Sequence, residues 1–249
     1  MFKIVSPKGK TILVDPWISN NPTCVSKGEN DWLNLDAILI THGHFDHSAG
    51  LDDALAFSPQ AKIVTPYELG LRLMAQGKKN VFAMNKGGTI ELDGIKCSMV
   101  GADHSSSVMN PDGSSSDLAE AAGYVLELED GFKVYIAGDT GLTSDMKFVV
   151  RDYYKPQMAI LPVSGLFAMT PEQAVVAAEA VGAKYVIPCH DFPESSFFPD
   201  PQGYNIFLEQ YPFIRMMIGK SKEFGRLMEK KRKIKTIVLE LGDSKEITK

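Results

Sequence analysis

The chain has 249 residues, and its 44% hydrophobic content is enough to form the core of one large domain or two small ones. Its 26 basic and 31 acidic residues give a net charge of −5, which provides no overall attraction for nucleic acid or an anionic membrane. Three widely separated cysteines, Cys24, Cys97 and Cys189, do not make a disulfide framework and predict reduced thiols.

Short runs rich in β-branched residues predict strands through the first part of the chain. These runs cover residues 11–14, 37–40, 89–92, 95–100, 124–128 and 133–136. Two connections, Asp93-Gly94 and Asp130-Gly131, carry the signal of a tight hairpin turn, so we expect the middle of the chain to be antiparallel.

Two segments carry the signals of a helix N-terminus. Thr65-Pro66-Tyr67-Glu68 and Thr170-Pro171-Glu172-Gln173 each place an N-cap residue, a first-turn proline and a capping-box partner before an apolar-periodic segment. We therefore predict helices near residues 66–75 and 171–181. Strand-like runs at 184–187 and 236–241 indicate that helix and strand alternate in the C-terminal half.

All five histidines are candidate metal ligands, and three of them lie in the run Thr41-His42-Gly43-His44-Phe45-Asp46-His47. His42 and His44, two apart on an extended chain, project to one side and can share an ion, whereas Asp46 and His47 then turn toward a neighbouring one. Imidazole and carboxylate ligands suit zinc, iron, manganese, cobalt or nickel, and the missing thiolates argue against a structural zinc site. A lone histidine would more often be a core residue, but four potential ligands within six residues disfavour that interpretation.

The candidate ligands share a position relative to the predicted strands. His42, His104, Asp139 and His190 each follow the end of a predicted strand, where catalytic groups are usually held on a rigid sheet. The serine-rich segment 105–118 follows His104 directly and is the best candidate for a mobile loop. Its position makes it a candidate lid.

These motifs resemble the metallo-β-lactamase superfamily, whose members show a His-x-His-x-Asp-His run, a later His, a Gly-Asp carboxylate and a final His. More narrowly, His104-Ser105-Ser106-Ser107 and Ala137-Gly138-Asp139-Thr140-Gly141 are similar to the hydrolases related to ascorbate-6-phosphate lactonase. The resemblance covers residues 12–190. It implies an α+β fold, a four-layer αββα sandwich with two sheets flanked by helices, and we expect residues 1–249 to form a single domain of this type.

The resemblance also implies which residues bind the metal ions. A first ion is held by His42, His44 and His104, and a second by Asp46, His47 and His190, with Asp139 bridging. Asp46 and Asp139 are the catalytic carboxylates of this set. The cofactor is then two divalent ions, zinc first, with manganese, iron, cobalt and nickel as alternatives. A hydroxide between the ions would attack an ester, lactone, amide or phosphodiester.

Two further positions are candidates for supporting the ligands. Asp15 and Thr41 are placed to orient imidazoles by accepting their second N–H, although a turn cap at Asp15-Pro16 is an equally good interpretation of Asp15. Ser105, Ser106 and Ser107 are polar groups that can reach a substrate, but serines in a loop are more often solvated turn residues. We therefore place them outside the main site.

Other functions remain open at this stage. A related iron-dependent persulfide dioxygenase group uses this ligand run with a single iron, whereas seven potential ligands favour two ions. Nucleic-acid phosphodiesterase activity would depend on the basic run between Lys220 and Lys235, but such a run is usually the solvated face of an amphipathic helix, so this activity ranks third. A binding module without metal would normally lack ligands.

The expected setting follows from what the sequence lacks. The first residues have no apolar signal-peptide core, and no apolar run approaches the roughly 20 residues of a membrane span. We therefore expect a cytoplasmic enzyme with a small-molecule substrate, without a membrane or nucleic-acid partner. Its oligomeric state is open, and homo-oligomers are common among soluble enzymes.

Overall fold

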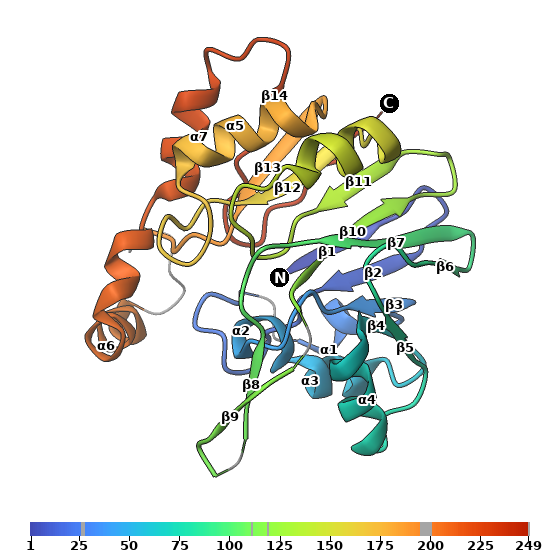
Figure 1. The fold of residues 1–249 in the computed structure, drawn as a ribbon. Helices are drawn as coiled ribbons and strands as arrows, with labels where there is room; N and C mark the ends of the chain where they lie inside the picture. The colour runs from blue at the N-terminus through green and yellow to red at the C-terminus, as the bar shows by residue number, and fades with distance from the viewer. Residues whose placement is uncertain (26–27, 111, 119, 195–200, 249) are drawn as a thin grey trace. The chain divides into compact units, whose positions relative to one another are not determined.

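The computed structural model describes residues 1–25, 28–110, 112–118, 120–194 and 201–248 (Figure 1). The chain separates into two compact units. Unit 1 comprises residues 1–21 and 26–131, and unit 2 comprises residues 22–25 and 132–249. The single domain over residues 1–249 stays a prediction.

Unit 1 contains a five-stranded sheet whose strands follow one another in chain order. Its strands are β1 (Phe2–Val5), β2 (Thr11–Val14), β3 (Ala37–Leu39), β4 (Lys62–Pro66) and β5 (Val81–Met84). β1 and β2 are antiparallel, and the other neighbours are parallel. The central strands are almost wholly apolar and buried, as parallel strands covered on both faces usually are. The expected strand at 11–14 is confirmed, and the one expected at 37–40 ends one residue earlier.

The helices of unit 1 lie in the connections of this sheet. They are α1 (Glu29–Trp32), α2 (Phe45–Ser48), α3 (Leu51–Phe57) and α4 (Tyr67–Ala75). The expected helix at 66–75 is present, but the expected cap is wrong, because Pro66 occupies the N-cap position without a side-chain hydrogen bond. Thr65 is buried in β4, where it pairs with Ala83 of β5, and this pairing keeps the backbone extended through Pro66. Tertiary pairing therefore overrides the local signal.

Unit 1 also contains the antiparallel strands β6 (Thr89–Leu92), β7 (Ile95–Gly101) and β10 (Ala122–Glu127). The β6–β7 turn has φ of 51° at Asp93 and 94° at Gly94, as the Asp-Gly signal predicts for a tight hairpin. Tyr124 of β10 is fully buried, and its hydroxyl donates to the carbonyl of Ile40 at 2.8 Å. This bond connects β10 to the residue that precedes the Thr41–His47 run.

The serine-rich segment 105–118 is a hairpin of β8 (Ser107–Met109) and β9 (Ser115–Asp117), drawn in green in Figure 1. Pro111 lies outside the described residues. Near the tip, Asn110 accepts a hydrogen bond from Nη2 of Arg72 in α4 at 2.9 Å. Its amide also donates to the hydroxyl of Ser116 at 2.9 Å. The segment therefore has ordered secondary structure, and its closure as a lid stays a prediction.

Unit 2 contains four parallel strands in the order β14-β13-β12-β11. They are β11 (Lys133–Ile136), β12 (Met158–Pro162), β13 (Tyr185–Cys189) and β14 (Lys235–Thr236). The strand expected over 236–241 is wrong beyond its first residue. The register of β13 and β14 would next require an N–H at residue 188 to donate to Ile237, and Pro188 has none.

The helices of unit 2 are η1 (Met146–Tyr154), α5 (Pro171–Val181), α6 (Pro201–Gln210), η3 (Pro212–Met217) and α7 (Lys220–Met228). The capping box of Thr170 and Gln173 is present, and the expected helix 171–181 is confirmed. α7 buries Phe224 and Met228 and turns its basic residues outward, as an amphipathic helix does. Within the described residues, no helix combines the length and hydropathy that a membrane span requires.

We predict that Tyr124→Phe lowers the free energy of unfolding by about 1–3 kcal/mol at neutral pH, because the buried Ile40 carbonyl loses its donor. Burial raises the pKa of Tyr124 well above its usual value, so the stability that depends on its protonated form is lost as pH rises above about 10. The difference in free energy of unfolding between wild type and Tyr124→Phe should therefore become smaller above pH 10. Denaturant unfolding at pH 7 and above pH 10 measures this difference at each pH, with the exposed Tyr153→Phe as control. An equal gap at both pH values would contradict the linkage.

Candidate metal centre

The carboxylate of Asp15 connects β2 to the histidine-rich run. It is buried, and it accepts hydrogen bonds from the Thr41 N–H at 2.8 Å, the Thr41 hydroxyl at 2.9 Å and Nδ1 of His47 at 2.9 Å. Its backbone has a φ of 53°, a conformation that Asp tolerates better than most residues. Three donors on one buried carboxylate indicate an ionised acceptor that fixes the start of the run.

This network also determines which ring nitrogen of His42 carries the proton. The Thr41 hydroxyl has one proton, which it donates to Asp15, so it accepts the hydrogen bond from Nδ1 of His42 at 3.0 Å. His42 is then protonated at Nδ1, and its Nε2 presents a lone pair. The same reasoning places a proton on Nδ1 of His47, so that the neutral ring presents the lone pair of Nε2. Both are the forms that a metal ligand requires.

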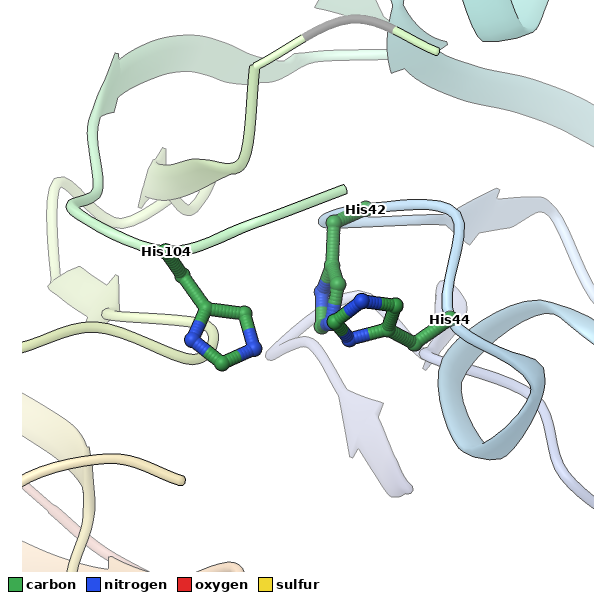
Figure 2. A group of neighbouring side chains, drawn as sticks. All are labelled: His42, His44 and His104. Carbon is green, nitrogen blue, oxygen red and sulfur yellow. The ribbon is translucent and has the colours of Figure 1, made fainter. Parts of the chain in front are cut away.

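Three histidines of unit 1 converge on one point, as Figure 2 shows. His42 and His44 come from the loop after β3, and His104 comes from the loop after β7. One nitrogen from each ring lies within 4.8 Å of the other two. Nε2 of His42 and Nδ1 of His44 are 2.9 Å apart. The ring centroids of both residues lie 5.1 Å from the ring centroid of His104. The family resemblance implied this grouping of His42, His44 and His104, and its binding of a metal stays a prediction.

Asp46 and His47 lie in the single turn of α2, directly after these residues. Nε2 of His47 is 3.5 Å from Oδ2 of Asp46, and its ring centroid is 4.1 Å from that of His42. The chain changes from extended at His44 to helical at Phe45, so Asp46 and His47 project from a helical turn rather than from extended backbone. A second pair of candidate ligands therefore lies beside the first group in unit 1.

Unit 2 brings together the two remaining candidates, Asp139 and His190. Oδ2 of Asp139 is 3.0 Å from Nε2 of His190, and Asp139 is 3% exposed. Asp139 follows β11 and His190 follows β13, so both lie at the C-terminal ends of parallel strands in one sheet. His190 has a φ of 58°, a conformation that a histidine rarely adopts and that marks a constrained position.

The residue after His190 links the ligand to a helix. The N–H of Ser221, in the first turn of α7, donates to Oδ2 of Asp191 at 2.9 Å. Burial raises the pKa of the Asp191 carboxyl above its usual value, and the hydrogen bond from Ser221 offsets only part of that increase. Asp191 therefore ties the His190 segment to the N-terminus of α7, a role that the sequence did not indicate.

Sequence reasoning also missed Ser106. It is buried rather than solvated, and its hydroxyl accepts a hydrogen bond from the N–H of Gly43 at 3.1 Å. The Ser105 hydroxyl lies 3.4 Å from Nε2 of His44. The residues that approach each other here are about 60 positions apart, and no local pattern in the sequence encodes that approach.

A model of the β-lactamase superfamily domain matches residues 10–190, which include every candidate ligand. The chain belongs to the metallo-β-lactamase superfamily. Among its relatives, a UPF0173 metal-dependent hydrolase of Rubrobacter xylanophilus is 39% identical over 191 residues, covering 76% of this chain and 77% of the relative. Another, of Methanosphaera stadtmanae, is 42% identical over 192 residues, covering 76% and 79%.

Solved structures agree with this assignment. Igni18, a metallo hydrolase from the archaeon Ignicoccus hospitalis, superposes with a TM-score of 0.72 and 27% identity, over 94% of this chain and 89% of Igni18. The predicted superfamily, the α+β fold of the metallo-β-lactamase type and the class of metal-dependent hydrolase are thereby confirmed.

We predict that Asp15→Asn lowers the affinity for a first-row divalent ion by about 10- to 100-fold, the usual effect of losing the partner of a ligating histidine. Asn has the same shape and tolerates positive φ, but its single acceptor oxygen cannot serve all three donors. Competition with a chromophoric zinc chelator measures the change. Asp53→Asn is the matched control, because Asp53 accepts a backbone N–H from Ser19 away from the centre. Equal affinities for Asp15→Asn and wild type would contradict the role.

Proposed function

We propose that this enzyme is a dinuclear hydrolase that cleaves an ester, lactone, amide or phosphodiester bond in a small molecule. In this proposal His42, His44 and His104 hold the first ion, Asp46, His47 and His190 hold the second, and Asp139 bridges them. The assignment follows the ligand order of the superfamily. The observation that carries it is the convergence of three ring nitrogens within 4.8 Å of one another in unit 1.

The donor set fits such an ion. A zinc–nitrogen bond of about 2.0–2.1 Å places tetrahedrally arranged nitrogens about 3.4 Å apart. This spacing lies between the 2.9 Å that separates the ligating nitrogens of His42 and His44 and the 4.8 Å limit of the group. Small ring rotations therefore bring the three nitrogens to coordination distance. Absence of a cysteine from the group fits an open catalytic site rather than a closed structural one.

When bound, such ions lower the pKa of water toward neutrality and polarise the attacked carbonyl or phosphoryl oxygen. The protein residues orient the ligands for this chemistry. Asp15 and Thr41 hold His42 and His47 in the tautomers that leave Nε2 free of a proton. Asp46 and Asp139 contribute negative charge that offsets the charge of two cations.

The two alternatives differ from this proposal in measurable ways. A persulfide dioxygenase would hold one iron, and a nucleic-acid phosphodiesterase would need an exposed basic surface. Several basic residues of the run from Lys220 to Lys235 instead form ion pairs within unit 2: Lys220 with Glu223, Lys222 with Glu194 and Lys231 with Glu179. These pairs favour the solvated helix over a nucleic-acid surface.

Protein purified without added metal should contain close to two equivalents of a divalent ion per chain, measured by elemental analysis. A chelator should abolish turnover of a panel of ester, lactone and phosphodiester substrates, and zinc or manganese should restore it. One equivalent of iron, with persulfide-dependent oxygen uptake, would instead support the dioxygenase. Chelator-resistant hydrolysis would contradict the proposal.

His44→Ala and Asp139→Ala should each lower kcat/KM by at least about 100-fold, since each removes one proposed ligand. Circular dichroism and denaturant unfolding of the metal-free proteins should show near wild-type folding for both. Asp152→Ala, an exposed carboxylate change in unit 2, should leave turnover within about twofold. If both ligand variants kept wild-type turnover, the dinuclear mechanism would be wrong.

A further inference from the structure

The glycine between His42 and His44 lies against the base of the β8–β9 hairpin. A Cβ added to Gly43 would stand 2.9 Å from the backbone carbonyl oxygen of Ser107 and 2.9 Å from Cγ2 of Val108. Contacts this short with backbone cannot be relieved by a side-chain rotation, so only glycine permits the approach. The hairpin base therefore packs directly against the segment that carries two proposed ligands.

A glycine at this position also makes the backbone more flexible, because glycine has the largest allowed range of φ and ψ. The segment from His42 to His44 therefore needs another constraint to keep its two rings in a fixed relative orientation. On one side, the N–H of Ala122 donates to the carbonyl of Thr41 at 3.0 Å. On the other side, the N–H of Gly43 donates to the hydroxyl of Ser106 at 3.1 Å.

Ser106 is itself fixed at the base of the hairpin. Its hydroxyl donates to the carbonyl of Leu118 at 2.7 Å, and its own carbonyl accepts from the N–H of Leu118 at 3.1 Å. Because the single hydroxyl proton points at Leu118, the oxygen lone pairs face Gly43. The side chain is 7% exposed, so water has little access to replace either bond. The geometry makes Ser106 a rigid acceptor.

The bond from Gly43 constrains the peptide group that joins His42 to Gly43. The direction of this N–H is set by ψ of His42 and φ of Gly43, and these angles also set the direction in which the His44 ring leaves the chain. The two ring nitrogens are 2.9 Å apart, and both lone pairs must face one ion. A small rotation of this peptide would therefore separate the ligating nitrogens.

We propose that Ser106 is a positioning residue of the metal centre, whose hydroxyl holds the Gly43 peptide so that His42 and His44 present their nitrogens to the same ion. The role rests on the proposed function, because it requires those two histidines to share a metal. Ser106 contacts neither substrate nor ion in this role. The hairpin 105–118 is then part of the ligand scaffold at its base.

The test compares Ser106→Ala with Ser116→Ala. Ser116→Ala removes a hairpin hydrogen bond to Asn110 but not the bond to Gly43, so it controls for simple loosening of the hairpin. Zinc affinity is measured by competition with a chromophoric chelator, and the visible spectrum of the cobalt-loaded protein reports ligand geometry. We expect Ser106→Ala to weaken zinc binding by about 10- to 100-fold and to change the cobalt spectrum, and Ser116→Ala to do neither.

Amide hydrogen exchange at Gly43 in the metal-free wild type provides a measurement that does not depend on a variant. Slow exchange, with faster exchange in Ser106→Ala but not in Ser116→Ala, is the expected result. Rapid exchange in the wild type, or unchanged zinc affinity and cobalt spectrum in Ser106→Ala, would overturn the positioning role alone. A wild type that bound neither zinc nor cobalt would instead overturn the proposed function, and the role of Ser106 with it.

Discussion

The buried carboxylate of Asp15 is the constraint on which the rest of the site depends. A carboxylate at 6% exposure is costly unless it is hydrogen-bonded, and here Thr41 and His47 supply three donors to it. The hydrogen bonds that stabilise the charge are also the bonds that fix the start of the ligand run. The same contacts therefore stabilise unit 1 and orient two of the proposed ligands. A neutral or shorter residue at position 15 would leave the tautomers of His42 and His47 undetermined.

The regular strands form the rigid frame of the site. The irregular backbone that follows each strand orients the side chains of the proposed ligands and of Asp15. Asp15 follows β2 with a φ of 53°, and His190 follows β13 with a φ of 58°. Such conformations are energetically unfavourable by about 1–3 kcal/mol each and persist only where the surroundings determine them. At Asp15 the surroundings are its hydrogen-bonded donors. At His190 they include the bond from the Val163 N–H to the Cys189 carbonyl and the contact of Asp191 with α7.

The sequence predicted those features whose physical cause is local. Ligand chemistry restricts residue type, so the histidine run and the later His104, Asp139 and His190 were visible without coordinates, although their binding of metal stays a prediction. The same was true of the helix capped by Thr170 and of the strands that the β-branched runs indicated, whereas β1, β4, β5 and β12 were not predicted. Features that depend on distant contacts could not be predicted. Thr65 carries the same local signal as Thr170, but pairing with β5 keeps it extended. The strand expected over 236–241 stopped because its neighbour has Pro188, and Ser106 acquires its role from Gly43, 63 positions away.

The match to the superfamily domain model ends at residue 190, whereas the likeness to Igni18 covers 94% of the chain and so includes most of the segment that follows. That segment is attached to the last proposed ligand, His190. The N–H of Phe192 donates to Met217, and the N–H of Gly219 donates to the Phe192 carbonyl, both at 3.2 Å. The Phe192 ring stacks on Phe207 of α6 with the two planes 11° apart. Since His190 precedes these anchors by only two residues, a change in the packing of α6, η3 or α7 reaches its backbone directly. The C-terminal helices thus hold the backbone of His190, a proposed ligand, and among the described residues the candidate ligand groups include none of their own side chains.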